Sequence, residues 1–330
     1  MIISRSPLRI SLGGGGTDLP FYYRNYGGFL ISGAIDKYIY LAVNKRFYKS
    51  IRLGYSKTEI IPKANKIKHP IFREAFKLLG IKDSIEAVSI ADIPSGSGLG
   101  SSGAFTVCLL NALHTYKREF VPLQQLAEEA CIIEMEKLKE PVGKQDQYAS
   151  AFGGISAFTI EKDGSVEVQP VRIPNGSLAE LENNILLFYL NQERPASAVL
   201  ADQTKVAKKA KSNVISNMHR IKEMGKEVFK AFEKGKIDTF GELLDEHWQN
   251  KKKLSNKMTN PFIDECYEMA KQNGAIGGKV IGAGGGGFLM LYSKQNTSHL
   301  TRIMEKNGLV RERFRFDFEG AKIIANFRKS

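Results

Sequence analysis

Two acidic side chains, Glu134 and Asp146, are the residues of this sequence whose type and spacing most clearly suggest chemistry. Residues 123–138 have the apolar periodicity of a helix, and Glu134 falls on the same face as Leu123 and Ala127. We therefore expect Glu134 to point inward. A buried carboxylate must be paired or bind a cation, because burying it alone is costly. The pattern leaves a metal ligand and a structural salt bridge equally open.

Asp146 lies beyond that helix in the segment 141–148, which we expect to form a tight loop close to Glu134. One carboxylate on a metal ion and a second able to take a proton from a hydroxyl are what phosphoryl transfer to an alcohol requires. By itself, Asp146 could equally cap the turn that follows it. Next to a phosphate-binding loop, however, the two carboxylates indicate a kinase.

Three glycine-rich segments, at 13–16, 96–103 and 282–287, could bring backbone close to a ligand. The middle segment stands between an expected strand and an expected helix, where successive N–H groups form an anion site suited to a triphosphate. It is not a Walker loop, because no Lys follows the glycines, and a structural turn is the alternative. The residues that we expect to bind the phosphates of ATP are Gly96, Ser97, Gly98, Leu99, Gly100, Ser101, Ser102 and Gly103.

The first glycine run is flanked by Arg9 on one side and by Thr17 and Asp18 on the other. Arg9 could stabilise charge on a transferring phosphoryl group or lower the pKa of the acceptor, and Asp18 could accept hydrogen bonds from sugar hydroxyls. A surface strand followed by a loop is the alternative interpretation of this segment.

The elements that must position these residues fall into three blocks, with strands first, then helices, then strands again. We expect strands at 2–6, 10–12, 29–35, 38–47, 84–91, 154–160, 166–171, 184–190, 278–281, 287–292, 310–316 and 321–324, with a turn at Asp36–Lys37. We expect helices at 70–79, 103–117, 123–138, 196–233, 238–257, 261–273 and 297–307. This order favours an α+β fold, and a change of composition near 175–184 predicts two domains, 1–180 and 181–330.

The composition, 42% hydrophobic and 25% charged, is that of a globular protein, and the formal net charge is +13. That charge fits either nucleic-acid binding or attraction of small anions. The densest basic run, 205–211, lacks interleaved aromatic residues and is better explained as a solvated helix face. Cys108, Cys131 and Cys266 are too far apart for a metal knuckle or redox motif, so we expect buried thiols. With no secretory leader or long apolar run, we expect a cytoplasmic protein.

These motifs resemble the three signature segments of the GHMP kinases, in the right order and over nearly the whole chain. Residues 94–104 resemble the second motif, the ATP phosphate loop, and residues 282–287 resemble the third, which packs against nucleotide and substrate. The resemblance implies a two-domain fold with the active site between a ribosomal-S5-like N-terminal domain and a ferredoxin-like C-terminal domain.

Galactokinases, one branch of this family, have an acidic Mg²⁺ ligand, Pro, Gly and the catalytic Asp at the offsets of Glu134, Pro141, Gly143 and Asp146. The resemblance implies ATP and Mg²⁺ as cofactors, with Glu134 and Ser102 (or Ser101) on the metal and with Asp146 and Arg9 as catalytic residues. The residues that we expect to bind the substrate are Gly15, Gly16, Thr17, Asp18, Arg194, Gly284 and Gly285.

One departure from the galactokinase pattern bears on the acceptor. Galactokinases carry a Glu-His pair just before the Thr-Asp, where this chain has Gly15 and Gly16. A roomier and less negative pocket, in a chain with a net charge of +13, suits a phosphorylated acceptor. Residues 4–20, 143–154 and 315–323 resemble the bacterial D-glycero-D-manno-heptose 7-phosphate kinases, which use ATP to phosphorylate the anomeric hydroxyl for nucleotide-heptose and surface polysaccharide synthesis.

The sequence keeps other functions open: a fucokinase- or galactokinase-like enzyme acting on an unphosphorylated sugar, a nucleic-acid-binding S5-like protein, or a sensor that binds nucleotide and sugar without turnover. We expect the partners to be a sugar phosphate and MgATP, without nucleic acid or membrane, and the protein to be a monomer or homodimer. The distal phosphate of the acceptor has three candidate ligands in Arg194, Lys37 and Lys144.

Overall fold

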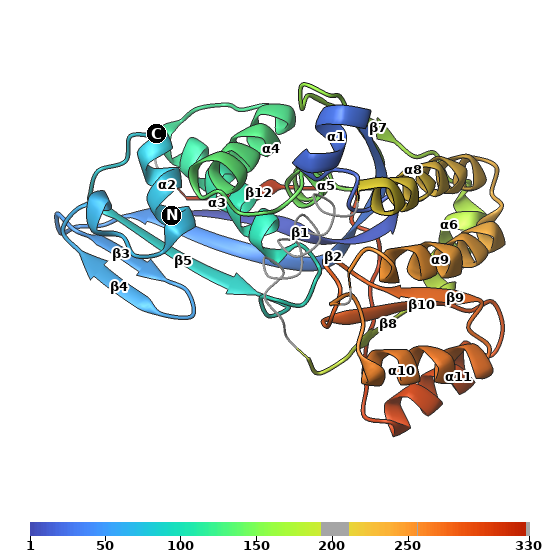
Figure 1. Cartoon of the computed structure of the whole chain (residues 1–330). Coiled ribbons are helices and arrows are strands. Elements are labelled where there is room, and N and C mark those ends of the chain that lie inside the picture. Colours follow the sequence, from blue (N-terminus) through green and yellow to red (C-terminus); the bar gives the residue numbers. More distant parts are fainter. Residues whose placement is uncertain (193–210, 256, 328–330) are drawn as a thin grey trace.

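The computed structural model describes residues 1–192, 211–255 and 257–327. Within these ranges the chain forms two sheets covered by helices (Figure 1). The elements of the N-terminal half are β1 (Ile2–Gly13), α1 (Pro20–Tyr26), β2 (Gly28–Lys45), β3 (Ile51–Gly54), β4 (Thr58–Ile61), η1 (Ala64–Lys66), α2 (Pro70–Leu78), β5 (Ile85–Ala91), α3 (Ser101–Lys117), α4 (Leu123–Cys131), the π-helical turn η2 (Ile132–Lys137), α5 (Gln145–Phe152), β6 (Ile155–Ile160) and β7 (Val166–Pro170). The remaining elements are α6 (Asn175–Asn184), β8 (Ile185–Tyr189), α8 (Lys211–Glu233), α9 (Ile237–Lys252), α10 (Pro261–Gln272), β9 (Gly277–Val280), β10 (Phe288–Tyr292), α11 (Thr297–Lys306), β11 (Val310–Glu312) and β12 (Lys322–Asn326).

The first sheet is built around the long strand β2. Its strand order is β12-β1-β2-β5-β3-β4, and the first half of β2 also pairs with β6, which in turn pairs with β7. Helices α3 and α5 pack against β1 and bring their N-termini to the same region. Figure 1 shows α3, α4 and α5 together over this sheet. The sheet therefore serves as the platform that positions the phosphate loop and Asp146.

The second sheet, in the order β11-β8-β10-β9, is entirely antiparallel. Strand β8 reads as a continuous apolar run because both of its faces are buried. Ile185 and Leu187 face the main core, whereas Leu186 and Phe188 face a second core formed with α9, α10 and α11. This sandwiched position explains why the strand was predictable from sequence without an alternating pattern.

Two predicted breaks in the first sheet are wrong. We expected separate strands on either side of Pro7 and a turn at Asp36–Lys37, but β1 and β2 each run through these positions. The register shifts between Pro7 and Leu8, and the extra residues Asp36 and Lys37 lie opposite that step. A bulge accommodates proline because it needs no ladder N–H there.

Several further elements differ from the sequence prediction. The hairpin β3–β4 and helix α6 were not predicted, and residues 145–148 begin helix α5 rather than ending a loop. The predicted helix 123–138 ends in the π-helical turn η2, and Leu123, expected on its buried face, is 37% exposed. The predicted helix 196–233 is described from Lys211 onward, and its earlier part, like the basic run up to residue 210, lies outside the described residues.

The last strand returns to the beginning of the chain. β12 pairs antiparallel with β1, so the C-terminal segment completes the first sheet. The division into two domains at residue 180 stays a prediction. β12 follows residue 180 in the chain but belongs to the sheet that the N-terminal half forms. All three cysteines are free and buried, as predicted. No helix in the described part of the chain is long and apolar enough to cross a membrane.

Candidate active site

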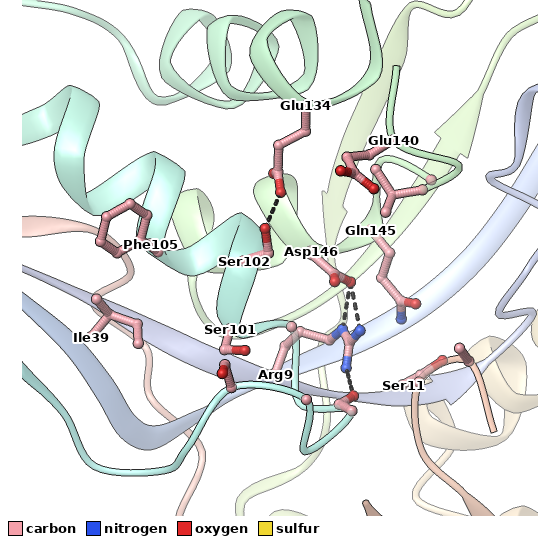
Figure 2. A pocket seen from close by; sticks show the side chains of 18 of the residues that line it. Arg9, Ser11, Ile39, Ser101, Ser102, Phe105, Glu134, Glu140, Gln145 and Asp146 are labelled. Atoms are coloured by element: carbon pink, nitrogen blue, oxygen red, sulfur yellow. Dashed lines mark hydrogen bonds and ion pairs between the residues drawn. The ribbon is translucent and has the colours of Figure 1, made fainter. Parts of the chain in front are cut away.

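A cavity of about 1060 Å³ lies where the two halves of the chain meet. Its walls come from the later half of β1, the glycine loop before α3, the segment from Leu138 to Asp146, helix α9 and strand β9. It gathers most of the residues that the sequence singled out, including Arg9, Glu134 and Asp146 (Figure 2). The three predicted chemical elements, which are the phosphate loop, the carboxylates and the arginine, therefore share one site.

The glycine loop meets this cavity at the N-terminus of α3. Gly100 is the N-cap, with a φ of +79°, and Ser101 and Ser102 form the first helical turn. Because glycine has no side chain to cap the helix, the N–H groups of the first turn remain available to an anion. The predicted phosphate-binding residues that line the cavity are Gly96, Gly98, Gly100, Ser101 and Ser102.

The other three members of the predicted loop support it from behind. Ser97 and Leu99 are fully buried, and the carbonyl of Leu99 accepts the backbone N–H of Arg9 at 3.0 Å. A Cβ at Gly103 would lie 2.6 Å from the Cβ of Asp146. Glycine at this position is therefore what lets the first turn of α3 touch the catalytic candidate.

Arg9 holds Asp146 at the centre of the cavity. Its Nε donates to Asp146 Oδ1 at 2.8 Å, its Nη2 lies 2.6 Å from the same oxygen, and its Nη1 donates to the carbonyl of Gly98 at 2.6 Å (Figure 2). Both contacts to the carboxylate go to Oδ1, which leaves Oδ2 for a ligand. Arg9 thus ties the carboxylate to the phosphate loop.

Glu134 is 2% exposed, which confirms the inward orientation predicted from the helical pattern. Ser102 Oγ donates to its Oε1, and Gln147 Nε2 donates to its Oε2 at 2.7 Å. Burial raises the pKa of Glu134 to about 7, although both hydrogen bonds favour the charged form. No salt bridge to Glu134 occurs among the described residues, so the structural salt bridge considered above has no basic partner there.

The pair Glu134 and Ser102 fits Mg²⁺. This ion is usually held by one or two carboxylates together with phosphate oxygens rather than by an all-protein cage. Residues 1–192, 211–255 and 257–327 contain no group of three His, Cys, Asp or Glu side chains that could hold a metal by themselves. A cation bound by Glu134 and Ser102 would take its remaining ligands from a nucleotide and water.

Asp18 is 5% exposed and lies in the cavity wall. Its Oδ2 accepts the backbone N–H of Gln145 at 3.0 Å, and its Oδ1 accepts that of Gly16 at 3.2 Å. A Cβ at Gly143 would lie 1.9 Å from Asp18 Oδ2, so only glycine fits there. Burial, partly offset by these hydrogen bonds, raises the pKa of Asp18. The Asp18 carboxylate anchors the start of α5, which carries Asp146.

Several predicted substrate-binding residues lie elsewhere. Gly15 and Gly16 line the cavity, but Thr17 is fully buried, where its hydroxyl donates to the carbonyls of Gly14 and Phe29. Gly284 and Gly285 pack against Met258, while Gly282 and Ala283 line the cavity in their place.

Two of the three basic candidates for a distal phosphate, Lys37 and Lys144, do not line the described cavity. Lys37 pairs with Glu312 at 2.6 Å, and Lys144 donates to the carbonyl of Gly164. Arg194 lies outside the described residues.

The structure adds cavity residues that the sequence did not suggest. Ser11 Oγ and Gln145 Nε2 are buried without a hydrogen-bond partner among the described residues, and both lie beside Arg9 (Figure 2). His247, Lys251 and Lys279 line the side formed by α9 and β9. Lys279 had a usable signal, because it is a single charge inside an otherwise apolar strand next to the third glycine segment.

Comparison with known proteins agrees with this site. Residues 43–154 match the GHMP kinases N terminal domain, and residues 228–307 match the GHMP kinases C terminal domain. The chain is 30% identical to the D-glycero-alpha-D-manno-heptose 7-phosphate kinase of Campylobacter jejuni, over 97% of this chain and 98% of that protein. It is 26% identical to the L-fucokinase/L-fucose-1-P guanylyltransferase of Bacteroides fragilis, over 93% of this chain and 36% of that protein.

Among solved structures, a D-glycero-D-manno-heptose 1-phosphate kinase from Bacteroides thetaiotaomicron superposes with a TM-score of 0.82 at 25% identity, covering 99% of this chain and all of that one. Fold and site together define a small-molecule phosphotransferase. The chain belongs to the GHMP kinases, which are ATP-dependent, and it is a sugar kinase, a phosphotransferase with an alcohol group as acceptor. The predicted α+β fold is confirmed, and the nucleic-acid-binding alternative is not favoured.

Proposed function

We propose that this kinase transfers the γ-phosphoryl group of ATP to the anomeric hydroxyl of D-glycero-D-manno-heptose 7-phosphate and so produces the 1,7-bisphosphate. The observation that carries the reaction type is the contact between Asp146 and the first turn of α3, where only Gly103 allows the two to meet. The acceptor is supported by the similarity, along the whole chain, to the heptose 7-phosphate kinase of Campylobacter jejuni.

The cavity offers suitable surroundings for ATP. The N-terminus of α3 would bind the phosphates through backbone N–H groups and the helix dipole. Beyond this turn, the cavity is lined by apolar and aromatic side chains, among them Ile39, Tyr55 and Phe105. Such a surface suits a purine base, because its stacking needs no charge.

In the proposed reaction, the anomeric oxygen attacks the γ-phosphorus in line, the bond between that phosphorus and the β–γ bridging oxygen breaks, and ADP leaves. The hydroxyl proton passes to Oδ2 of Asp146, the carboxylate oxygen that Arg9 does not contact. The guanidinium of Arg9 steadies the negative charge that develops between the loop and the acceptor.

Glu134 and Ser102 would hold Mg²⁺, which supplies charge neutralisation at the phosphate oxygens. The buried Glu134 carboxylate is suited to this role because a bound cation compensates its charge. Gln147, which donates to the second oxygen of Glu134, keeps that side chain oriented toward Ser102.

The acceptor would lie against the first glycine segment. Gly15 and Gly16 leave space for a seven-carbon sugar, and the unpartnered Ser11 Oγ and Gln145 Nε2 are suited to its hydroxyls. Asp18 would contribute from the wall, where it already fixes the loop that leads to Asp146. We expect a cytoplasmic enzyme, monomeric or homodimeric, on a route to nucleotide-heptose and surface polysaccharide.

The test is ADP release with MgATP across D-glycero-D-manno-heptose 7-phosphate, mannose 6-phosphate, galactose, fucose, mevalonate and homoserine. Turnover confined to the heptose phosphate, with phosphorus NMR showing a new phosphate on the anomeric carbon, is the expected result. Asp146→Asn supplies the matched background. Turnover on fucose or galactose without the heptose phosphate would favour the alternative, a kinase of an unphosphorylated sugar. ATP binding without any turnover would favour a sensor.

A further inference from the structure

Three basic side chains, His247, Lys251 and Lys279, form a cluster on the wall that α9 and β9 contribute to the cavity. His247 and Lys251 are four residues apart on α9 and share one face of that helix. Lys279, on β9, is 1% exposed, and His247 is 3% exposed. Basic side chains are rarely buried to this extent unless something of opposite charge compensates them.

No such compensation comes from the described part of the chain. Within residues 1–192, 211–255 and 257–327, neither lysine has a carboxylate within 4.0 Å. Burial lowers the pKa of Lys279 and of Lys251, and the positive charge of Arg9 adds to the effect at both. For His247, burial is again the main cause of a lowered pKa, and the two lysines reinforce it. The cluster thus gathers three basic groups that no carboxylate of the described residues neutralises.

The hydrogen bonds in the cluster leave donors unused. Lys279 Nζ lies 3.2 Å from His247 Nδ1, and an ammonium group can only donate, so the proton of the neutral ring belongs on Nε2. That Nε2 is buried and has no partner among the described residues. Lys251 Nζ donates to the carbonyls of Gly282 at 2.5 Å and Val280 at 3.4 Å. The lysines and the ring therefore have donors to spare for a ligand that is rich in acceptor oxygens.

From this geometry we infer that His247, Lys251 and Lys279 bind a phosphate monoester carried by the acceptor, at the end remote from the hydroxyl that is phosphorylated. This assignment rests on the proposed function, since it presumes an acceptor that already bears one phosphate. A phosphate monoester offers oxygens to all three side chains, and its charge neutralises the cluster.

The nucleotide is the less suitable occupant. In the proposed function, its phosphates bind at the N-terminus of α3. The apolar end of the cavity, which suits the base, lies near β3 and α2. Figure 1 shows α9 and β9 on the opposite side of the molecule from β3 and α2. The cluster therefore lies on the α9 and β9 wall, away from the apolar end of the cavity that suits the base.

The test replaces each lysine by methionine, in Lys279→Met and Lys251→Met, with Lys253→Met as the control. Lys253 is at the end of the same helix and exposed, so its loss changes the net charge equally without touching the cavity. Isothermal titration calorimetry measures the Kd for heptose 7-phosphate, inorganic phosphate and MgADP, and thermal melting verifies folding. We expect folded variants, because removing a buried uncompensated cation relieves desolvation.

Both cavity variants should raise the Kd for heptose 7-phosphate and for inorganic phosphate by about ten- to hundred-fold and leave the Kd for MgADP unchanged. The control Lys253→Met should leave all three Kd values unchanged. A higher Kd for MgADP alone would assign the cluster to the nucleotide and overturn the inference. Unchanged Kd values for every probe would also overturn it. If the wild-type enzyme turns over heptose 7-phosphate and the variants keep its KM, the inference fails and the proposed function stands. If only unphosphorylated sugars are turned over while inorganic phosphate still binds through both lysines, the proposed acceptor fails and the anion site stands.

Discussion

Replacing Glu134 with Gln tests whether the metal-free protein holds a buried carboxylate whose charge no cation compensates. The side chain is 2% exposed, and burial raises its pKa from the ordinary 4.5 to about 7. The metal-free folded state therefore binds the proton of Glu134 more tightly than the unfolded chain does. Its contribution to stability is favourable at low pH and is lost as the pH rises from about 4.5 through about 7.

The size of the effect follows from that pKa difference. A pKa rise from 4.5 to about 7 corresponds to about 3 kcal/mol of unfolding free energy, lost between the two pH limits. The amide of Glu134→Gln is neutral at every pH and can still accept the hydrogen bond from Gln147. At pH 8, without metal, the variant should be more stable than the wild type by up to that amount. At pH 5 most of the difference should be gone.

The assay is urea unfolding in EDTA at intervals between pH 5 and 8.5, with the wild type and Glu134→Gln compared at each pH. Titration of other groups, such as His69, His114 and His247, is common to both proteins and cancels in the difference. MgADP should then stabilise the wild type more at pH 8 than at pH 5, and it should stabilise the variant much less. Parallel stability curves for the two proteins would refute the reasoning.

Three further predictions concern the loop and the fold. Asp146→Asn should lower kcat by about 10²- to 10⁴-fold and leave the Kd for ATP within a few fold, measured by steady-state turnover and calorimetry; undiminished turnover would exclude Asp146 as the base. Gly143→Ala puts a Cβ 1.9 Å from Asp18 Oδ2, so it should cost about 1–3 kcal/mol in urea unfolding and impair acceptor binding, whereas Gly176→Ala, with open space around the added Cβ and no positive φ, should do neither. Burial disfavours the charged ring of His114. The Glu129 carboxylate and a second carboxylate beside it outweigh the effect of burial and raise the pKa of His114. His114→Gln should therefore destabilise the protein by about 1–2 kcal/mol near pH 6 and progressively less as the pH rises through the folded pKa; a constant loss would contradict that sign.

Local sequence patterns were enough to predict the parts of the site that depend on one element. The inward position of Glu134 followed from helical periodicity, and the phosphate loop followed from glycines placed between a strand and a helix. The apolar strand β8 was likewise predictable, because burial on both faces requires an unbroken apolar run. In each case the physical constraint acts on residues close together in the chain.

Local patterns misled where a long-range partner overrode them. Pro7 and the pair Asp36–Lys37 look like strand breaks, yet each compensates the other in one bulge between β1 and β2. The sequence suggested Asp18 as a sugar ligand, and it did not show that the same carboxylate also accepts the N–H groups of Gly16 and Gln145. The neighbouring sequence predicts neither of these contacts, because only folding brings the partners together.

By itself, the sequence determined the class of chemistry: a carboxylate forced inward, an anion-binding helix start and an arginine beside a glycine run are each encoded within a few residues. Only the tertiary structure decided how these parts meet. It placed Arg9 on Asp146 across 137 positions of the chain, and it brought His247, Lys251 and Lys279 into the same cavity. Electrostatic complementarity to a ligand depends on distances in space, and spacing along the chain does not specify them.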